Sequence, residues 1–176
     1  MKILLHACCA PCGAHIIEQL KKDYEVAVYY CNPNIHPAEE YERRKAEIKN
    51  YCDKNKIKFI EEKYNPEEWF ELTKGLEQEP ERGARCPVCF SFRLGKTAEY
   101  AKANGFDFFT TTLTISPHKS TEQIFTAGRE AEKKTGVKFL ARDWKLDNGF
   151  KCSCDKSKEE GFYRQKYCGC VYSIRK

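Results

Sequence analysis

The chain has 176 residues, of which 41% are hydrophobic and 13% aromatic, and its 31 basic and 26 acidic side chains give a formal charge of +5. This apolar content is sufficient for one compact domain with a buried core and excludes an intrinsically disordered chain. The first apolar run ends at His6, too early for a signal peptide or a membrane span, so we expect a cytoplasmic protein without a membrane partner.

Five short β-type runs alternate with helical patterns along the chain. In order, the runs are Lys2–His6, Glu25–Tyr30, Lys56–Glu61, Asp107–Leu113 and Val137–Leu140. Alternation of strands and helices is typical of α/β proteins, because a helix connects each parallel strand to the next. The sequence therefore predicts a single α/β domain with a parallel sheet flanked by helices.

The helical patterns carry recognisable start signals. One-face amphipathic patterns predict a first helix from about residue 11 to 22 and a second from about 37 to 54. Asn65 followed by a proline predicts a short third helix, since proline is favoured at the first helical position. Ser120 with Gln123 forms a capping box, which predicts the start of another helix.

The C-terminal segment, from about Asp143 onward, lacks this periodicity and is expected to be irregular. We therefore divide the single domain, residues 1–176, into an α/β core, residues 1–142, and a C-terminal segment, residues 143–176. Between Lys145 and Lys176, eight basic residues outnumber four acidic ones and aromatic residues are interleaved. Such a stretch can pair with phosphates and stack on unpaired bases, and a solvated basic surface packed by tyrosines explains it equally well.

Cysteine is about three or four times more frequent than in ordinary proteins, with eleven in the chain. In the cytosol thiols stay reduced, so clustered cysteines there bind metal or perform redox chemistry. Cys31 and Cys52 stand alone, and we expect both to be buried as small hydrophobic residues. The remaining nine form four clusters: Cys8, Cys9 and Cys12; Cys86 and Cys89; Cys152 and Cys154; Cys168 and Cys170.

The first two clusters have the features of a metal site. Cys8, Cys9 and Cys12 lie between the first strand and the first helix, at the sheet edge where ligands bind in open parallel sheets. Cys86 is expected to cap another helix, which also carries Cys89. Helix N-termini stabilise thiolates, the form of cysteine that metals require. Four thiolates suit zinc or an iron–sulfur cluster, and adjacent cysteines, which are unusual in zinc sites, favour iron–sulfur.

Cys168 and Cys170 are separated by a single residue. A disulfide across one residue closes a very small ring, and strained bridges are easily reduced, so the pair suits electron transfer. Two free thiols in a surface loop are the alternative. Cys152 and Cys154 receive no role from the sequence.

Four other residues lie at loops on the predicted ligand edge. His118 and Lys119 precede the capped helix, where a cation at a helix N-terminus makes a natural phosphate site. For His6 and His36 a substrate contact and an ordinary structural hydrogen bond both remain open.

Five separated motifs together resemble the QueH type of epoxyqueuosine reductase. In order, they are His6–Cys12, Cys31–Pro37, Cys86–Phe90, Thr110–Lys119 and Tyr163–Cys170. The resemblance covers nearly the whole chain and implies a Rossmann-like fold similar to that of PP-loop nucleotide-hydrolase-like proteins. It also implies an enzyme that reductively removes the epoxide oxygen of epoxyqueuosine in tRNA, giving queuosine in the last step of queuosine biosynthesis. A 4Fe-4S cluster, an additional iron and an external electron donor are implied as well.

Position by position, the resemblance implies roles for six cysteines. The cluster ligands would be Cys8, Cys9, Cys86 and Cys89, and the redox-active disulfide pair would be Cys168 and Cys170. Cys12, one helical turn from the cluster ligands, is assigned by hypothesis to the second iron, and so to catalysis. The residues expected to hold the anticodon nucleotide or its phosphates are His118, Lys119, Tyr163, Arg164 and Gln165.

Three other functions are compatible with parts of the sequence. Cys9 and Cys12 after a strand resemble a thioredoxin site, but a thiol-disulfide oxidoreductase leaves the other clusters unexplained. A PP-loop tRNA thiolase needs a Ser-Gly-Gly phosphate loop after the first strand, where this chain has Ala7, Cys8 and Cys9. A non-catalytic zinc module that binds RNA would contain zinc and no iron.

Overall fold

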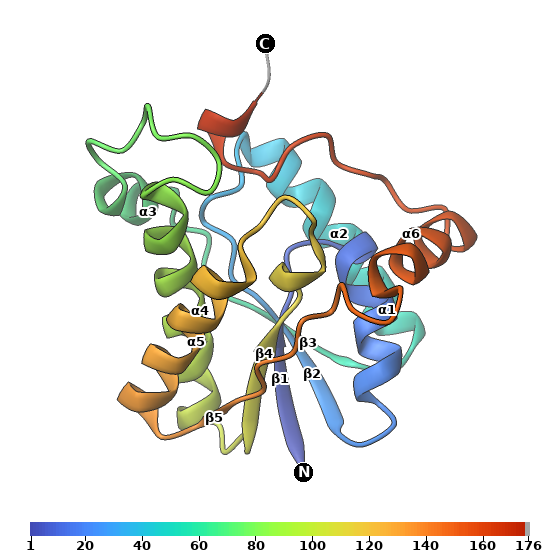
Figure 1. Ribbon diagram of the computed structural model, residues 1–176. Coiled ribbons are helices and arrows are strands. Elements are labelled where there is room, and N and C mark those ends of the chain that lie inside the picture. Colours follow the sequence, from blue (N-terminus) through green and yellow to red (C-terminus); the bar gives the residue numbers. More distant parts are fainter. Residues whose placement is uncertain (175–176) are drawn as a thin grey trace.

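All five strands of the central sheet are parallel (Figure 1). The computed structural model describes residues 1–174. The strands are β1 (Lys2–His6), β2 (Glu25–Tyr30), β3 (Lys58–Glu61), β4 (Phe108–Thr111) and β5 (Lys138–Phe139), in the order β3-β2-β1-β4-β5 across the sheet. The predicted Rossmann-like α/β fold is confirmed, although β3, β4 and β5 are shorter than expected. The strand order reverses between β1 and β4, which is where ligands bind in open parallel sheets.

Residues 1–174 contain six α-helices. They are α1 (Ala10–Leu20), α2 (Ala38–Lys54), α3 (Pro66–Leu72), α4 (Arg85–Ala103), α5 (Thr121–Thr135) and α6 (Gly149–Glu159), with short 3-10 turns at Leu113–Ile115 and Val171–Ser173. In residues 1–174 there is no helix with both the length and the apolar character needed to span a bilayer.

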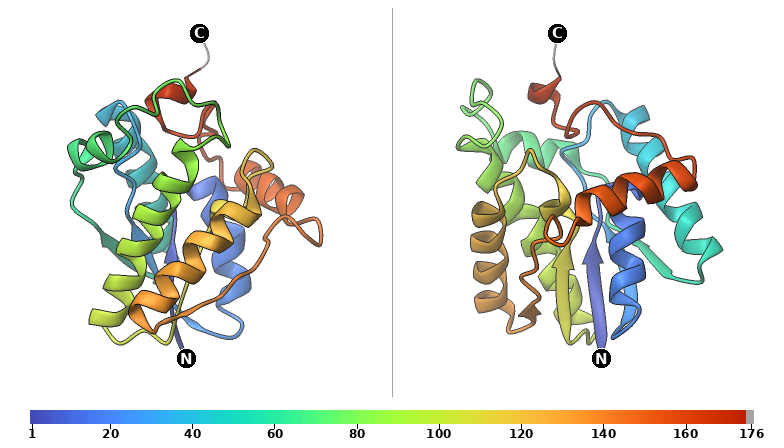
Figure 2. Two further views of the ribbon diagram at one scale, coloured as in Figure 1. Left: turned by 60° about the vertical axis from the view of Figure 1, so that its left-hand side comes forward. Right: turned by 45° about the vertical axis from the view of Figure 1, so that its right-hand side comes forward.

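Successive residues of β1 face opposite layers of helices. Ile3 and Leu5 belong to a hydrophobic cluster with residues of α1 and α2, whereas Leu4 belongs to a second cluster with α4 and α5. Side chains alternate between the two faces of a strand, so both faces of this central strand are buried. Figure 2 shows α1 and α2 (blue and cyan) on one side of the sheet and α4 and α5 (green and orange) on the other.

The predicted helix starts are largely confirmed. The Ser120 Oγ atom accepts a hydrogen bond from the Gln123 backbone N–H at 3.3 Å and caps α5. Pro66 stands at the start of α3. The expectation that Cys86 caps its helix is wrong, because α4 begins at Arg85 and its N-cap residue is Ala84.

The C-terminal segment is not irregular throughout, which corrects the sequence prediction. Its residues 149–159 form α6, which packs across α1, and only the remainder is irregular apart from one 3-10 turn. The buried face of α6 consists of small residues such as Ser153 and Ser157, so it lacks the apolar periodicity by which amphipathic helices are found. Ser153 Oγ donates to the Pro11 carbonyl at 2.5 Å. Arg175 and Lys176, counted in the basic stretch, lie outside the described residues.

Candidate metal centre

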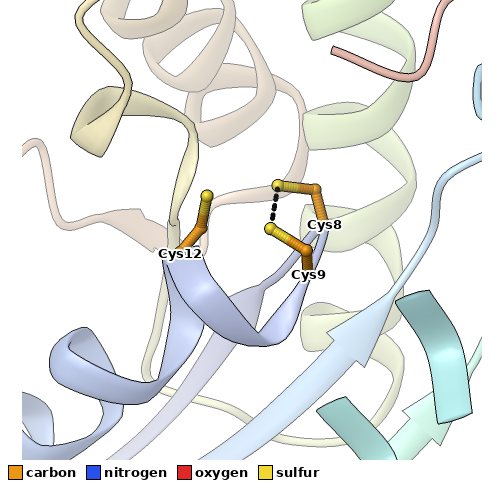
Figure 3. A group of neighbouring side chains, drawn as sticks. All are labelled: Cys8, Cys9 and Cys12. Atoms are coloured by element: carbon orange, nitrogen blue, oxygen red, sulfur yellow. Dashed lines mark hydrogen bonds between the residues drawn. The ribbon is translucent and has the colours of Figure 1, made fainter. Parts of the chain in front are cut away.

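Three cysteines converge where β1 passes into α1. The Sγ atoms of Cys8, Cys9 and Cys12 all lie within 4.8 Å of one another (Figure 3). Cys9 is the N-cap residue of α1, with extended backbone, and Cys12 lies in the first turn. Cys8 Sγ also lies 3.7 Å from the Thr112 Oγ1 atom, which follows β4. The trio therefore occupies a helix N-terminus at the point where the sheet order reverses, where exposed N–H groups favour thiolates.

The three thiols polarise one another. Hydrogen bonds with Cys12 and Cys9 hold the pKa of Cys8 well below its ordinary value, and Arg93 and Lys119 act in the same direction. The Cys8 contact raises the pKa of Cys12 well above its ordinary value. A hydrogen bond with Cys12 lowers the pKa of Cys9, but Cys8 and burial raise it to about 12. The contacts within the trio thus favour the thiolate form at Cys8 over Cys9 and Cys12.

A second group of four cysteines lies beside the trio. Cys86 and Cys89 occupy the first two turns of α4, and the C-terminal loop contributes Cys168 and Cys170. Cys89 and Cys170 are buried together against Trp69 of α3, and Cys168 packs on this cluster. The four residues line a small cavity of about 30 Å³.

The two cysteine groups share a wall. Cys8, Cys12 and Cys168 line a larger cavity of about 270 Å³, which adjoins the smaller one. Six residues line both cavities: Glu81, Arg93, His118, Lys119, Cys168 and Ser173. Of the four predicted cluster ligands, the structure thus places Cys8 and Cys9 within the close trio and the α4 pair in the adjoining cavity.

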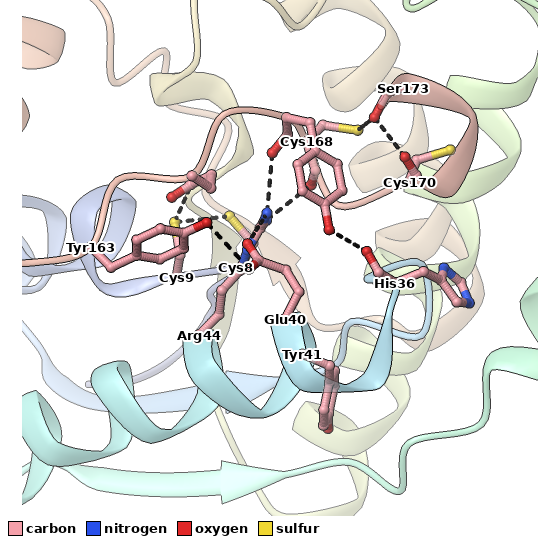
Figure 4. Close-up of polar contacts among 12 residues, drawn as sticks. Cys8, Cys9, His36, Glu40, Tyr41, Arg44, Tyr163, Cys168, Cys170 and Ser173 are labelled. Atoms are coloured by element: carbon pink, nitrogen blue, oxygen red, sulfur yellow. Dashed lines mark hydrogen bonds and ion pairs between the residues drawn. The ribbon is translucent and has the colours of Figure 1, made fainter. Parts of the chain in front are cut away.

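The C-terminal loop is fastened over the site by Arg44 of α2. This side chain is 1% exposed, and its Nη1 and Nη2 atoms each donate at 3.2 Å, to the Cys168 and Tyr167 carbonyls respectively (Figure 4). Its Nε atom donates to Glu40 at 2.7 Å. The Tyr167 hydroxyl in turn donates to the carbonyl of His36. The sequence did not reveal Arg44, because a basic residue four positions after a glutamate is typical of an exposed helix.

Four of the five predicted substrate residues line the larger cavity. Gln165 lies closest to the trio, and its Nε2 atom donates to Cys9 Sγ at 3.1 Å. Tyr163 is absent from the cavity wall: its hydroxyl donates to Glu40 at 3.3 Å and the Arg43 guanidinium lies 3.4 Å from the centre of its ring. The cavity-lining members are His118, Lys119, Arg164 and Gln165.

Lys119 is largely enclosed, with 13% of its side chain exposed and Glu81 at 4.0 Å. Burial lowers its pKa, but the nearby Cys168 and Cys8 thiols raise it overall. Both cysteine groups therefore favour the charged ammonium form of Lys119.

The predicted disulfide between Cys168 and Cys170 is not supported, because both are free thiols. The two side chains have different partners. Cys168 Sγ lies 3.1 Å from Ser173 Oγ, whereas Cys170 packs against Trp69 and Cys89. A hydrogen bond with Cys170 holds the pKa of Cys168 well below its ordinary value. Burial of Cys168 acts in the opposite direction and is outweighed. The structure shows a dithiol next to the larger cavity, and not in a surface loop.

The other cysteines and histidines divide between structural and cavity positions. Cys31 and Cys52 are 2% and 0% exposed, as predicted. His6 is buried and bonds Thr111 and the Cys31 carbonyl, so of its two open roles the structure shows the structural one. Cys154 of α6 lines the larger cavity and accepts a hydrogen bond from Arg164 at 3.3 Å, a position the sequence did not indicate.

The donor atoms at this site fit a soft metal. The trio contributes only sulfur, and soft thiolates select zinc, copper(I) or iron–sulfur clusters over magnesium or calcium. Arg93, at 2% exposure, brings a buried positive charge into the walls of both cavities. A buried cation favours an anionic partner, and a metal bound by several thiolates carries negative charge.

Comparison with known proteins gives one consistent result. A family model described as "QueH: Epoxyqueuosine reductase QueH" matches residues 3–176. A curated relative of that name from Haemophilus influenzae is 46% identical over 176 residues, and the alignment covers 99% of this chain and 72% of the relative. The Streptococcus pyogenes relative is 42% identical over 179 residues (98% and 70%), and the Thermotoga maritima relative 34% identical over 175 residues (98% and 90%).

Proposed function

The chain belongs to the epoxyqueuosine reductase QueH family, and from this membership we propose that it reduces epoxyqueuosine in tRNA to queuosine, as the last step of queuosine biosynthesis. The reaction removes the epoxide oxygen as water and leaves an alkene, which consumes two electrons and two protons. An external donor supplies the electrons, and the tRNA substrate suggests a cytoplasmic location. The observation that carries the proposal is the thiol trio in the wall of a cavity adjoining four more cysteines.

We assign the cluster ligands as Cys8, Cys9, Cys86 and Cys89, which would hold a 4Fe-4S cluster between the start of α1 and the start of α4. Cys12 would serve an additional iron, since its side chain lines the larger cavity whereas Cys9 does not. When bound, the cluster would supply single electrons and the iron would act as a Lewis acid toward the epoxide oxygen.

The larger cavity suits one modified nucleoside. Its volume of about 270 Å³ is close to the lower end of ordinary ligand pockets, which begin at about 300 Å³, and is far too small for an RNA helix. Apolar residues such as Ile115 and Phe150 line it together with cations. The target nucleotide would therefore leave the anticodon stack and enter alone, as in other enzymes that act on a base.

The polar residues around the cavity would bind this nucleotide. We assign Lys119 and Arg164 to its phosphates or those of its neighbours, because both are cationic and line the cavity. Gln165 and His118 would hydrogen-bond the nucleoside. Tyr163, outside the cavity wall, would contact a flanking nucleotide.

The Cys168 and Cys170 dithiol matches the stoichiometry of the reaction. Oxidation of two thiols to a disulfide releases two electrons and two protons, which is what the epoxide consumes. Both side chains line the smaller cavity, and Cys168 also lines the larger one. We therefore propose that the pair is a redox-active store of reducing equivalents that the external donor refills.

Anaerobic purification followed by iron, sulfide and zinc analysis tests this function most directly. We expect iron and sulfide, a brown colour, and conversion of epoxyqueuosine to queuosine in tRNA, measured by mass spectrometry of the nucleosides. Zinc without iron would instead support an RNA-binding module. A colourless, metal-free protein that reduces disulfides would support a thiol-disulfide oxidoreductase.

A further inference from the structure

Arg93 is a buried cation at the junction of the two cysteine groups. It lies on α4, one turn after Cys89, is 2% exposed, and lines both cavities. Its Nη1 atom lies 3.9 Å from Cys89 Sγ, and its Nη2 atom donates to Asn32 Oδ1 at 2.6 Å. Its Nε atom is buried without a hydrogen-bond partner. One amide oxygen and one sulfur are thus the side-chain partners of this guanidinium within residues 1–174.

The other two buried arginines are compensated differently. Arg44 is paired with the Glu40 carboxylate at 2.7 Å. Arg85 donates to three backbone carbonyls in the loop before α4. Arg93 has no carboxylate within 4.0 Å among the residues that the structure describes, and unlike Arg85 it donates to no backbone carbonyl there. A buried charge without a counterion is strongly destabilising, so the completed site must place negative charge beside Arg93.

Arg93 lies beside one cysteine of each group. Its Nη1 atom is 3.9 Å from Cys89 Sγ, and its side chain lines the larger cavity together with Cys8. One of these sulfurs is on α4 and the other follows β1, so the guanidinium faces both proposed ligand segments. Arginine keeps its charge at any pH that the protein tolerates, so this positive charge is permanent.

Asn32 extends the connection to the trio. Its Oδ1 atom accepts from Arg93, and its Nδ2 atom donates at 2.9 Å to the carbonyl of Ala7, the residue before Cys8. Asn32 is itself 2% exposed. A continuous polar chain therefore joins the segment that carries Cys8 to the helix that carries Cys89.

We infer that Arg93 is a positioning residue that compensates the negative charge of the thiolate-bound metal centre and thereby raises its reduction potential. This inference rests on the proposed iron–sulfur function. Adding an electron increases the negative charge of the centre, and a fixed cation in a low-dielectric interior makes that addition more favourable. Residues that contact metal ligands tune a centre in this way without binding the metal.

A redox titration of the anaerobically reconstituted protein, monitored by visible absorption, tests the inference. Arg93→Gln removes the charge, and Arg93→Lys keeps it while losing the guanidinium fork. Lys96→Gln is the matched control, because Lys96 lies three residues further along α4 and faces Glu68 at 3.8 Å, partly exposed. We expect a more negative midpoint potential in Arg93→Gln, a smaller shift in Arg93→Lys, and the wild-type value in Lys96→Gln.

Each outcome decides the question. A wild-type potential in iron-loaded Arg93→Gln, or a shift equal to that of Lys96→Gln, overturns the inference. If Arg93→Gln takes up no iron, the lysine variant decides: iron retention with a positive charge supports the inference, and equal loss in both variants overturns it. Failure of the wild-type chain to take up iron and sulfide would refute the proposed function instead, so the two failures are distinguishable.

Discussion

Gln165 Nε2 donates a hydrogen bond to Cys9 Sγ at 3.1 Å and thereby joins the C-terminal loop to the start of α1. The same nitrogen lies 3.9 Å from Cys12 Sγ. A donor from a distant segment therefore covers the thiol trio on the side of the larger cavity, and the C-terminal loop is part of the site.

Gln165→Ala should lower kcat/KM for epoxyqueuosine tRNA by about tenfold with unchanged iron content. Hydrogen bonds to charged groups contribute about 1.5 to 3 kcal/mol, and about 1.4 kcal/mol corresponds to a factor of ten. Steady-state kinetics and iron analysis measure the two effects. Gln19→Ala is the control, because the Gln19 side chain on α1 has one hydrogen-bond partner within the described chain, Lys22 at the surface. Equal kinetics in both variants would remove Gln165 from the substrate site.

Serine at Cys8 or Cys86 should abolish both the brown colour and the reaction, because oxygen is a poor substitute for a thiolate ligand of iron. Iron and sulfide analysis and the visible spectrum provide the measurement. Cys52→Ala, which changes a buried cysteine that lines neither cavity, should keep the brown colour and the reaction. Full iron and sulfide in Cys86→Ser would exclude α4 from the ligand set.

Cys12→Ser separates the second iron from the cluster. We expect the sulfide content to remain while about one iron per chain and the turnover are lost, because only the additional iron depends on this sulfur in our assignment. Full iron content together with full turnover would refute the assignment of Cys12.

Arg44→Met should destabilise the fold by about 3 kcal/mol or more, because removal of one member of a buried ion pair leaves the other charge unpaired. The double variant with Glu40→Gln should cost less, since no lone charge remains. Urea denaturation of the wild type, the two single variants and the double variant gives the coupling energy. An additive effect of the two substitutions would show that the two charges do not compensate each other.

Gly149→Ala should destabilise the protein by about 1 to 3 kcal/mol, the usual cost of overpacking. An added Cβ would lie 1.9 Å from the Trp144 carbonyl oxygen, where α6 begins. Gly95→Ala on α4 is the matched control, because nothing lies within 4 Å of its added Cβ, and alanine there should stabilise the helix by up to about 1 kcal/mol. Thermal denaturation that ranks the two variants the other way would contradict the packing of α6.

The secondary structure and the thiol trio could largely be predicted from the sequence. Periodicity of two or 3.6 residues reports which face of a segment is buried, and this held for β1, β2 and the first two helices. Cys8, Cys9 and Cys12 lie within one turn of chain, so the local backbone alone brings their sulfurs together. α6 was missed because its buried face is made of glycine and serine, which carry no hydrophobic signal.

The relationships that complete the site depend on tertiary structure. From the sequence, Arg93 is indistinguishable from an ordinary exposed charged residue of a helix. It is buried beside the cysteines because α4 packs against the loop that carries Asn32. Cys168 and Cys170 likewise acquire their positions from Arg44 and Trp69, which belong to distant helices. The local sequence shows which face of a helix or strand is buried. The partner of a buried charge depends on which distant segment packs against that face.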